Sequence, residues 1–281
     1  MRTGVVVTCR NDNYGGNLNR RATFCLNSLV DTFDEVWLID WNTPDEDPPL
    51  LHDIAEDIEL RGNINHIVVR PEIVEVLTRY DRRAQKVCEV LARNLGIRRA
   101  TTDWFVSTNI DIISPKREDL IKTIDGLDNN TFYTLSRRGV DPSLIEEFEV
   151  QHWREARDKL YSTVPERHFP EKIASEDDYS IINCCGDFQL APLHIWHTIR
   201  GFEETLVYAL YTDTNVQKKA VMHGFDLKAI YSPPAFHIDH GPGGGGGSGA
   251  NDIRCAVVDA GKTENEETWG FSNVEVEWET L

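Results

Sequence analysis

Three apolar segments decide the fold class of this chain: GVVVT at residues 4–8, EVWLIDW at residues 35–41 and NHIVV at residues 65–69. Their content of Val, Ile and Trp predicts β-strands. Between the first two segments, apolar residues recur at helical spacing through residues 22–30, which predicts a helix. A second helix is expected at residues 48–59, between the second and third segments. Alternating strands and helices predict a parallel sheet covered by helices.

The same alternation continues toward the C-terminus. We expect further helices at residues 83–95, 117–124, 194–199 and 212–222, and further strands at residues 103–107, 131–135 and 227–231. Gly96 is expected to cap the first of these helices, and Pro115 is expected to start the second. Residues 140–178 are charged and weakly periodic, with one expected helix at residues 143–161. We expect this stretch to form an insertion or lid over the second half of the chain.

The charge balance limits the partners of this protein. The chain has 281 residues, with 29 Lys and Arg against 47 Asp and Glu, and its formal net charge is -18. Such a field repels nucleic-acid phosphates, and an acidic protein would most easily bind a compact polyphosphate through a divalent cation. No apolar run approaches the roughly 20 residues of a membrane span, and the first residues lack the apolar region of a signal peptide. We therefore expect no nucleic-acid partner, no membrane span and a cytoplasmic location.

The cysteines show neither a disulfide framework nor a zinc-binding pattern. Only Cys184 and Cys185 are close in sequence, and adjacent residues do not have zinc-ligand spacing. We expect all six to be reduced and mostly buried: Cys9, Cys25, Cys88, Cys184, Cys185 and Cys255.

Four polar clusters follow expected strands, at residues 8–16, 40–43, 108–111 and 237–240. Ligands of open parallel sheets bind beyond the carboxyl ends of the strands, so the convergence of these clusters predicts a binding site. A single Asp after a strand is more often a turn or a helix cap, but four such clusters favour a site.

Asn109 and Asp111 are two positions apart after an expected strand, so their side chains are expected to point the same way. A carboxylate there could hold Mg²⁺ or Mn²⁺, which prefer oxygen ligands. His237 or His240 could add an imidazole, which suits Mn²⁺ better, although the HIDH run could equally be a structural turn.

Several common catalytic motifs are missing from the sequence. It has no G-x-x-x-x-G-K-[ST] loop, no G-x-G-x-x-G after the first strand and no G-x-S-x-G elbow. The glycine-rich run at residues 243–249 follows His240 instead of opening a helix. These absences weaken ATPase, dinucleotide-dependent dehydrogenase and hydrolase interpretations.

Seven segments occur in a fixed order: residues 10–18 (RNDNYGGNL), 40–44 (DWNTP), 92–100 (ARNLGIRRA), 108–112 (TNIDI), 185–188 (CGDF), 237–241 (HIDHG) and 265–271 (NEETWGF). In series they resemble nucleotide-sugar glycosyltransferases of the GT-A fold, in particular a family-2-like group called glycosyltransferase family A. The resemblance implies one α/β domain over residues 1–281, with a mostly parallel central sheet flanked by helices and a helical insertion. Residues 1–135 would form the nucleotide-binding half, residues 136–180 the insertion or lid, and residues 181–281 the acceptor half and C-terminal segment.

The resemblance also implies roles for single residues. The base and ribose would contact Thr8, Arg10, Asp12 and Asp40, and further donor contacts would come from Asn94, Arg98, Asn109, Ile110 and Asp111. Mn²⁺ or Mg²⁺ on the diphosphate would bind Asp111 and His240, or less readily His237. Acceptor or sugar contacts would come from Asp187, Glu203, Glu204 and Trp269. Asp213 would be the general base of an inverting reaction.

Two positions depart from the family's pattern. Asn109 stands where the family's D-x-D motif has its first Asp, which weakens metal affinity or leaves only a ribose contact. Thr212 stands where inverting members have a Glu before the base. An alternative role for Asp213 is therefore a solvated carboxylate at a helix N-terminus.

The expected function is metal-dependent transfer of a hexosyl or pentosyl group from a nucleoside-diphosphate sugar, a UDP-sugar in the first place, to a glycan or other hydroxyl acceptor. Two alternatives remain. A sugar nucleotidyltransferase is one, although its usual early glycine-rich loop is reduced here to Gly15 and Gly16. A nucleotide- or glycan-binding module without turnover is the other. The run at residues 243–249 is expected to be a loop that orders over the diphosphate, or a surface loop without a role.

Overall fold

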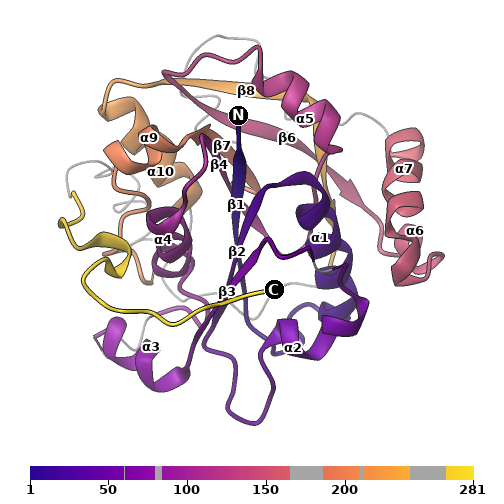
Figure 1. Cartoon of the computed structure of the whole chain (residues 1–281), viewed down its shortest axis with the longest axis horizontal. Coiled ribbons are helices and arrows are strands. Elements are labelled where there is room, and N and C mark those ends of the chain that lie inside the picture. Colours follow the sequence, from indigo (N-terminus) through magenta and orange to yellow (C-terminus); the bar gives the residue numbers. More distant parts are fainter. Residues whose placement is uncertain (60, 80–83, 165–185, 209–211, 241–263) are drawn as a thin grey trace.

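The computed structural model describes residues 1–59, 61–79, 84–164, 186–208, 212–240 and 264–281. Within these residues, nine strands form one sheet in the order β5-β8-β6-β7-β4-β1-β2-β3-β9 (Figure 1). The strands are β1 (Thr3–Cys9), β2 (Glu35–Trp41), β3 (Ile64–Val69), β4 (Trp104–Asn109), β5 (Ile112–Ile113), β6 (Thr131–Val140), β7 (Phe188–Pro192), β8 (Asp226–Ile238) and β9 (Glu279–Thr280). β4, β1, β2 and β3 are parallel neighbours, and β6 and β8 run in the same direction as these four. The predicted α/β class with a mostly parallel sheet is confirmed.

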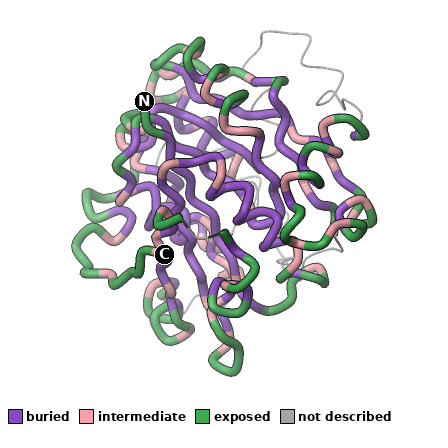
Figure 2. Tube along the Cα trace, turned by 45° about the vertical axis from the view of Figure 1, so that its right-hand side comes forward, coloured by how far each residue is buried: buried purple, intermediate pink, exposed green. Residues whose placement is uncertain are grey.

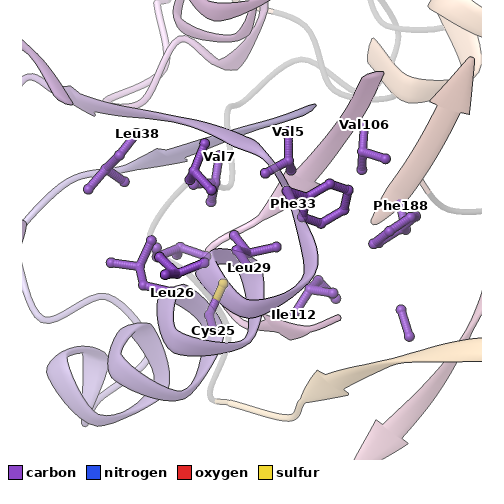
Figure 3. Close-up of a cluster of buried hydrophobic side chains, with 14 of the residues drawn as sticks. Val5, Val7, Cys25, Leu26, Leu29, Phe33, Leu38, Val106, Ile112 and Phe188 are labelled. Atoms are coloured by element: carbon purple, nitrogen blue, oxygen red, sulfur yellow. The ribbon is translucent and has the colours of Figure 1, made fainter. Parts of the chain in front are cut away.

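Helices cover both faces of the sheet because side chains on each strand alternate between them. Val5 and Val7 of β1 face α1 (Leu18–Thr32), α2 (Leu50–Ile54) and α5 (Arg117–Ile124), whereas Val6 faces the opposite layer. That layer contains α3 (Pro71–Leu77), α4 (Glu89–Arg99), α9 (Leu193–Thr198) and α10 (Thr212–Met222). Figure 3 shows the α1 side, and Figure 2 shows buried residues running along the central strands.

Gly96 does not end its helix, as the sequence predicted, but lies inside α4. An added Cβ at Gly96 would lie 2.6 Å from Val6 Cγ2 and 2.9 Å from Trp37 Cβ. The glycine is therefore required where α4 crosses the sheet at close range, and the helix continues to Arg99.

β6 and β8 are longer than predicted. The strand expected at residues 227–231 continues to Ile238, through the sequence Ser232-Pro233-Pro234. A bulge between Leu135 and Arg137 of β6 accommodates this stretch, and pairing resumes beyond it. His237 therefore lies inside a strand instead of following one.

The described part of the expected insertion contains α6 (Ser143–Glu146), a 3-10 helix (Val150–His152) and α7 (Trp153–Thr163), in place of one continuous helix. Trp153, Ala156 and Leu160 of α7 form a buried cluster with Phe24 of α1 and with residues of β8. α7 is thus packed on the first half of the chain as well as on the second. Residue 136, where the insertion was expected to begin, lies within β6.

Three cysteines are described, and each is free and buried: Cys9, Cys25 and Cys88. Cys184, Cys185 and Cys255 lie outside the described residues, as does the glycine-rich run at residues 243–249. Over the described parts of the chain, we find no helix with the length and apolar character needed to span a bilayer.

Candidate functional site

The predicted polar clusters meet at the carboxyl edge of the parallel strands. β1, β2 and β4 are parallel, so their last residues lie side by side. β7 runs the opposite way, and its first residue, Phe188, pairs with Thr108 near the end of β4. His237, near the end of β8, pairs with Ile112 just after β4. The edge thus collects residues from both halves of the chain.

Asp111, His237 and His240 form a compact group at this edge. Their ligand atoms all lie within 4.8 Å of one another. Asp111 Oδ2 is 2.9 Å from His240 Nε2, and Asp111 Oδ1 is 3.8 Å from His237 Nε2. Asp111 is only 4% exposed, and its Oδ1 has no hydrogen-bond partner among the described residues. A buried carboxylate oxygen without a partner, beside two imidazoles, fits a bound divalent cation.

Neighbouring groups orient the two imidazoles. His237 Nδ1 lies 3.1 Å from Asp239 Oδ1, which leaves Nε2 facing Asp111. The Tyr14 hydroxyl lies 3.2 Å from His240 Nε2, and the two rings meet edge to face. Metal-ligating histidines are commonly held through the other ring nitrogen, as His237 is here, whereas the Tyr14 hydroxyl approaches the same Nε2 of His240 that faces Asp111.

Gly15 allows the loop after β1 to approach His240. Its φ is +67°, and an added Cβ would lie 2.8 Å from His240 Nδ1. The Arg21 guanidinium of α1 donates to the carbonyl oxygens of Tyr14 and Gly16, so the loop is fixed against the helix. Tyr14 and Arg21 carry no recognisable signal for a role in the sequence, because Tyr14 meets His240 from 226 positions away and Arg21 acts only through the loop that holds Tyr14.

The electrostatics of this group favour an ionised Asp111. Burial by itself would raise the pKa of Asp111, but the hydrogen bond to His240 and the charges of His237, His240 and Arg21 outweigh burial and lower it. The carboxylate is therefore in the form that binds cations.

Asn109 is held by charged groups on both sides. Arg93 Nη2 of α4 donates to Asn109 Oδ1 at 2.6 Å, and Asn109 Nδ2 donates to Asp187 Oδ1 at 2.7 Å. Asp187 also forms an ion pair with Arg137 of β6. Arg93 is 3% exposed and was missed by sequence analysis, although it lies in the segment 92–100. A charged residue on the buried side of a helix was its only sequence signal.

Asp213 lies next to this network. Its Oδ2 accepts from the Gly186 amide at 2.8 Å, and its Oδ1 accepts from the Thr214 amide at 2.8 Å. Burial raises the pKa of Asp213, and it outweighs these two hydrogen bonds and the Arg93 charge. An added Cβ at Gly186 would lie 2.2 Å from Asp213 Cβ, so only glycine admits this approach. The predicted base is thus placed beside Asp187, at the same edge as Asp111.

The nucleotide contacts predicted on β1 and β2 are only partly exposed. Asp40 is fully buried, and its carboxylate accepts from Thr43 Oγ1 and from the Leu50 amide. Burial raises the pKa of Asp40, and these hydrogen bonds tie β2 to α2. Its carboxylate is therefore engaged within the protein.

Thr8 is 6% exposed and pairs with Asn109 across β1 and β4. Arg10 Nε lies 3.5 Å from Asp12 Oδ2 in the loop that follows. Thr8, Arg10 and Asp12 thus lie on the same edge as Asp111. Ile110 also lies there, but its side chain is 6% exposed and packs in the core on the α1 side.

Asn94, Arg98 and Trp269 are not brought to the Asp111 group. Asn94 is fully buried and binds the Phe202 backbone and Glu204. α4 runs antiparallel to β4, because Arg93 contacts the end of that strand whereas the helix ends just before its start. Arg98 near the end of α4 is therefore directed to the opposite edge, where its guanidinium lies 4.9 Å from the Trp269 ring centre. Trp269, 1% exposed, is a core residue.

The two glutamates expected near the sugar are also engaged within the protein. Glu203 is 5% exposed and accepts from Asn215 at 3.0 Å and from Thr205 at 2.9 Å. Glu204 accepts from Asn94 and from the backbone amide of Gly270. Both residues fix the loop before α10, so the structure does not place them in the Asp111 group.

Comparison with known proteins supports the fold. No family model matches the sequence, and no curated protein matches it significantly. Among solved structures, residues 1–349 of S. aureus TarS align with a TM-score of 0.52 at 14% identity, over 85% of this chain and 60% of that chain. A second S. aureus TarS structure has the same TM-score and identity, over 85% of this chain and 37% of that chain. The mannosyltransferase PcManGT from Pyrobaculum calidifontis, in complex with GDP-Man and Mn²⁺, aligns with a TM-score of 0.53 at 16% identity, over 86% of this chain and 57% of that one.

These matches and the sheet described above define the class: the chain has an α/β fold of the GT-A glycosyltransferase type. It spans 60% or less of the length of each of these three solved chains. At 14–16% identity the comparison shows the fold, and the chemistry depends on the residues of the site.

Proposed function

We propose that this protein is a metal-dependent glycosyltransferase that moves a sugar from a nucleoside-diphosphate sugar to a hydroxyl acceptor. The observation that carries the proposal is the group of Asp111, His237 and His240 at the carboxyl edge of the sheet, with a buried carboxylate oxygen that lacks a hydrogen-bond partner among the described residues. The solved mannosyltransferase of the same fold binds GDP-Man and Mn²⁺, which supports a nucleotide-sugar donor and a metal here.

Asp111 and one or both histidines would hold the cation. The imidazole nitrogens favour Mn²⁺ over Mg²⁺, which prefers all-oxygen ligands. A cation at this position would supply Lewis-acid stabilisation of the leaving diphosphate. Thr8, Arg10 and Asp12 are proposed to contact the nucleoside of a UDP-sugar, because they lie on the same edge at the end of β1.

Asp213 is proposed to accept the proton of the acceptor hydroxyl in an inverting reaction. Burial raises its pKa above that of an ordinary aspartate, which makes it a better proton acceptor in its ionised form. Asp187, which is tied to Asn109 and Arg137, is proposed to contact the sugar between Asp213 and Asp111.

Calorimetric titration with UDP and GDP, with and without MnCl₂, tests the metal role. Asp111→Asn should weaken Mn²⁺-dependent nucleotide binding at least about tenfold, because outer partners of metal ligands alone are worth that much. Asp125→Asn, which removes an exposed carboxylate at the end of α5, is the matched control and should bind as the parent does. Unchanged binding by Asp111→Asn would overturn the metal assignment.

A binding module without turnover is the second candidate. Both carboxylate oxygens of Asp213 accept backbone hydrogen bonds, and such contacts also suit a purely structural residue. A panel of UDP- and GDP-sugars, incubated without acceptor, separates the two candidates. A transferase releases the nucleotide slowly by donor hydrolysis, whereas a binding module binds the donor and releases none.

A further inference from the structure

A second group of metal-ligating side chains lies where the C-terminal strand joins the sheet. Glu279 of β9 pairs with His66 of β3, and its Oε1 lies 3.0 Å from His66 Nδ1. The same oxygen lies 2.8 Å from Nε2 of His52, which belongs to α2. The ligand atoms of the three residues lie within 4.8 Å of one another. This group contains no residue of the candidate glycosyltransferase site.

One member of the group is fixed and two are accessible. The side chain of His66 is fully buried, whereas those of His52 and Glu279 are 50% and 46% exposed. His66 Nε2 has no hydrogen-bond partner among the described residues, so the polar contacts of this buried ring lie on the side of the group, at Nδ1. A cation arriving from solvent would thus meet two adjustable ligands above one rigid ligand.

The spacing suits a tetrahedral transition-metal ion. Zinc binds imidazole nitrogen and carboxylate oxygen at about 2.0–2.2 Å, which places tetrahedral ligand atoms about 3.3 Å apart. The two imidazole–carboxylate distances of 2.8 and 3.0 Å need to open by only a few tenths of an ångström. The exposed side chains of His52 and Glu279 can move that far without repacking the core. Two imidazoles and one carboxylate form a donor set that favours Zn²⁺ over Mg²⁺ or Ca²⁺.

We propose that His52, His66 and Glu279 bind a zinc-class divalent cation that links α2, β3 and the C-terminal strand β9. The two residue pairs between β3 and β9 and the backbone bonds between Ile64 and Leu281 hold this strand to the sheet edge. Trp278, 49% exposed, adds one ring contact with Trp37. A cation bound to residues from three elements adds a cross-link at this short edge strand and stabilises the folded form by an amount that rises with the logarithm of the free cation concentration above its Kd.

Zinc titration of the metal-stripped full chain tests this site. The parent for the test is Asp111→Asn, because it removes a ligand of the first group and leaves the second intact. We expect it to bind one equivalent of Zn²⁺, and we expect the added changes His52→Ala and Glu279→Gln to weaken that binding at least about 100-fold. Both substitutions are at exposed side chains, and unfolding midpoints without zinc verify that the variants fold.

His152→Ala is the matched control, because His152 and Glu155 form a similar exposed histidine–glutamate pair that has no third ligand among the described residues. It should leave zinc binding unchanged. Hydrogen exchange gives a second readout: zinc should slow exchange of the Leu281 amide in the parent and not in the His52/Glu279 variant. Equal zinc affinity in the parent and that variant, or exchange at Leu281 that does not respond to zinc, would overturn the proposal.

Discussion

At Asn109, an amide occupies a position between a cation and an anion. Its oxygen accepts from Arg93 and its nitrogen donates to Asp187, so each end meets the charge that suits it. An aspartate there would keep the first contact but would place a second carboxylate against Asp187. The departure from D-x-D at this position is thus explained by local chemistry, and Asp111 becomes the carboxylate that faces the two histidines.

Asp213 is the residue whose chemistry can be tested most directly. Asp213→Asn should lower kcat about 10²–10⁴-fold, the usual contribution of a positioned general base, while Mn²⁺-dependent UDP binding stays unchanged. Because burial raises the pKa of Asp213 and the base acts when ionised, kcat should fall as the pH drops through that raised value. The fall should therefore begin at a higher pH than for an ordinary aspartate. Steady-state rates across pH measure both effects.

The Asp213→Asn variant should also lose this acidic limb of the pH profile. Asp125→Asn, with the same chemical change at an exposed site, should retain the parent rate and profile. A kcat for Asp213→Asn equal to that of the parent would remove Asp213 from the reaction.

At the scale of elements, the close contact of α4 with the sheet positions Arg93. α4 crosses over Val6 and Trp37 at Gly96, and Arg93, one turn earlier, reaches Ser107 and Asn109 on β4. A bulkier residue at position 96 would push the helix outward and move the Arg93 guanidinium away from β4. The glycine therefore links the packing of α4 to the geometry of the candidate site.

Gly96→Ala should lower the free energy of unfolding by about 1–2 kcal/mol. Overpacking costs about 1–3 kcal/mol, and the better helix propensity of Ala returns up to about 1 kcal/mol. Gly126→Ala is the control, because the nearest atom to an added Cβ there, the Thr123 oxygen, is 3.5 Å away. Urea denaturation measures both variants. Equal or greater stability of Gly96→Ala would show that α4 can shift without penalty.

At the scale of the whole molecule, two helical layers share one set of strands. Val6 faces the α4 layer and Val7 faces the α1 layer, although the two residues are adjacent on β1. Both helical layers pack on the same strands, so unfolding of the sheet under one layer would expose the buried face of the other layer. This arrangement supports the single domain expected from the sequence, which remains a prediction.

One cooperative unfolding transition should follow from this shared sheet. Val6→Ala and Val7→Ala, one on each face, should each lower the stability by about 2 kcal/mol, since each removes two buried methyl groups. Both should shift the same single transition, seen equally by far-ultraviolet dichroism and by tryptophan fluorescence. Two separate transitions, or a variant that shifts only one probe, would contradict a single folding unit.

Local patterns in the sequence determined the elements of the fold. An apolar run rich in Val, Ile and Trp placed β2, and the helices expected at residues 117–124 and 212–222 match α5 and α10. The polar clusters expected at the carboxyl ends of strands contain Asp111, His237 and His240. These features depend on residues close in sequence or on a general property of parallel sheets. One amino-acid sequence, without a structure, is therefore enough to predict these features.

Only the tertiary structure decided which distant side chains meet. The antiparallel pairing of β8 with β5 brings His237 against Ile112, and the direction of α4 carries Arg98 away from Asp111. His52 and Glu279, 227 residues apart, meet because β9 pairs with β3. Such contacts depend on register and packing between remote segments, and local periodicity carries no information about either.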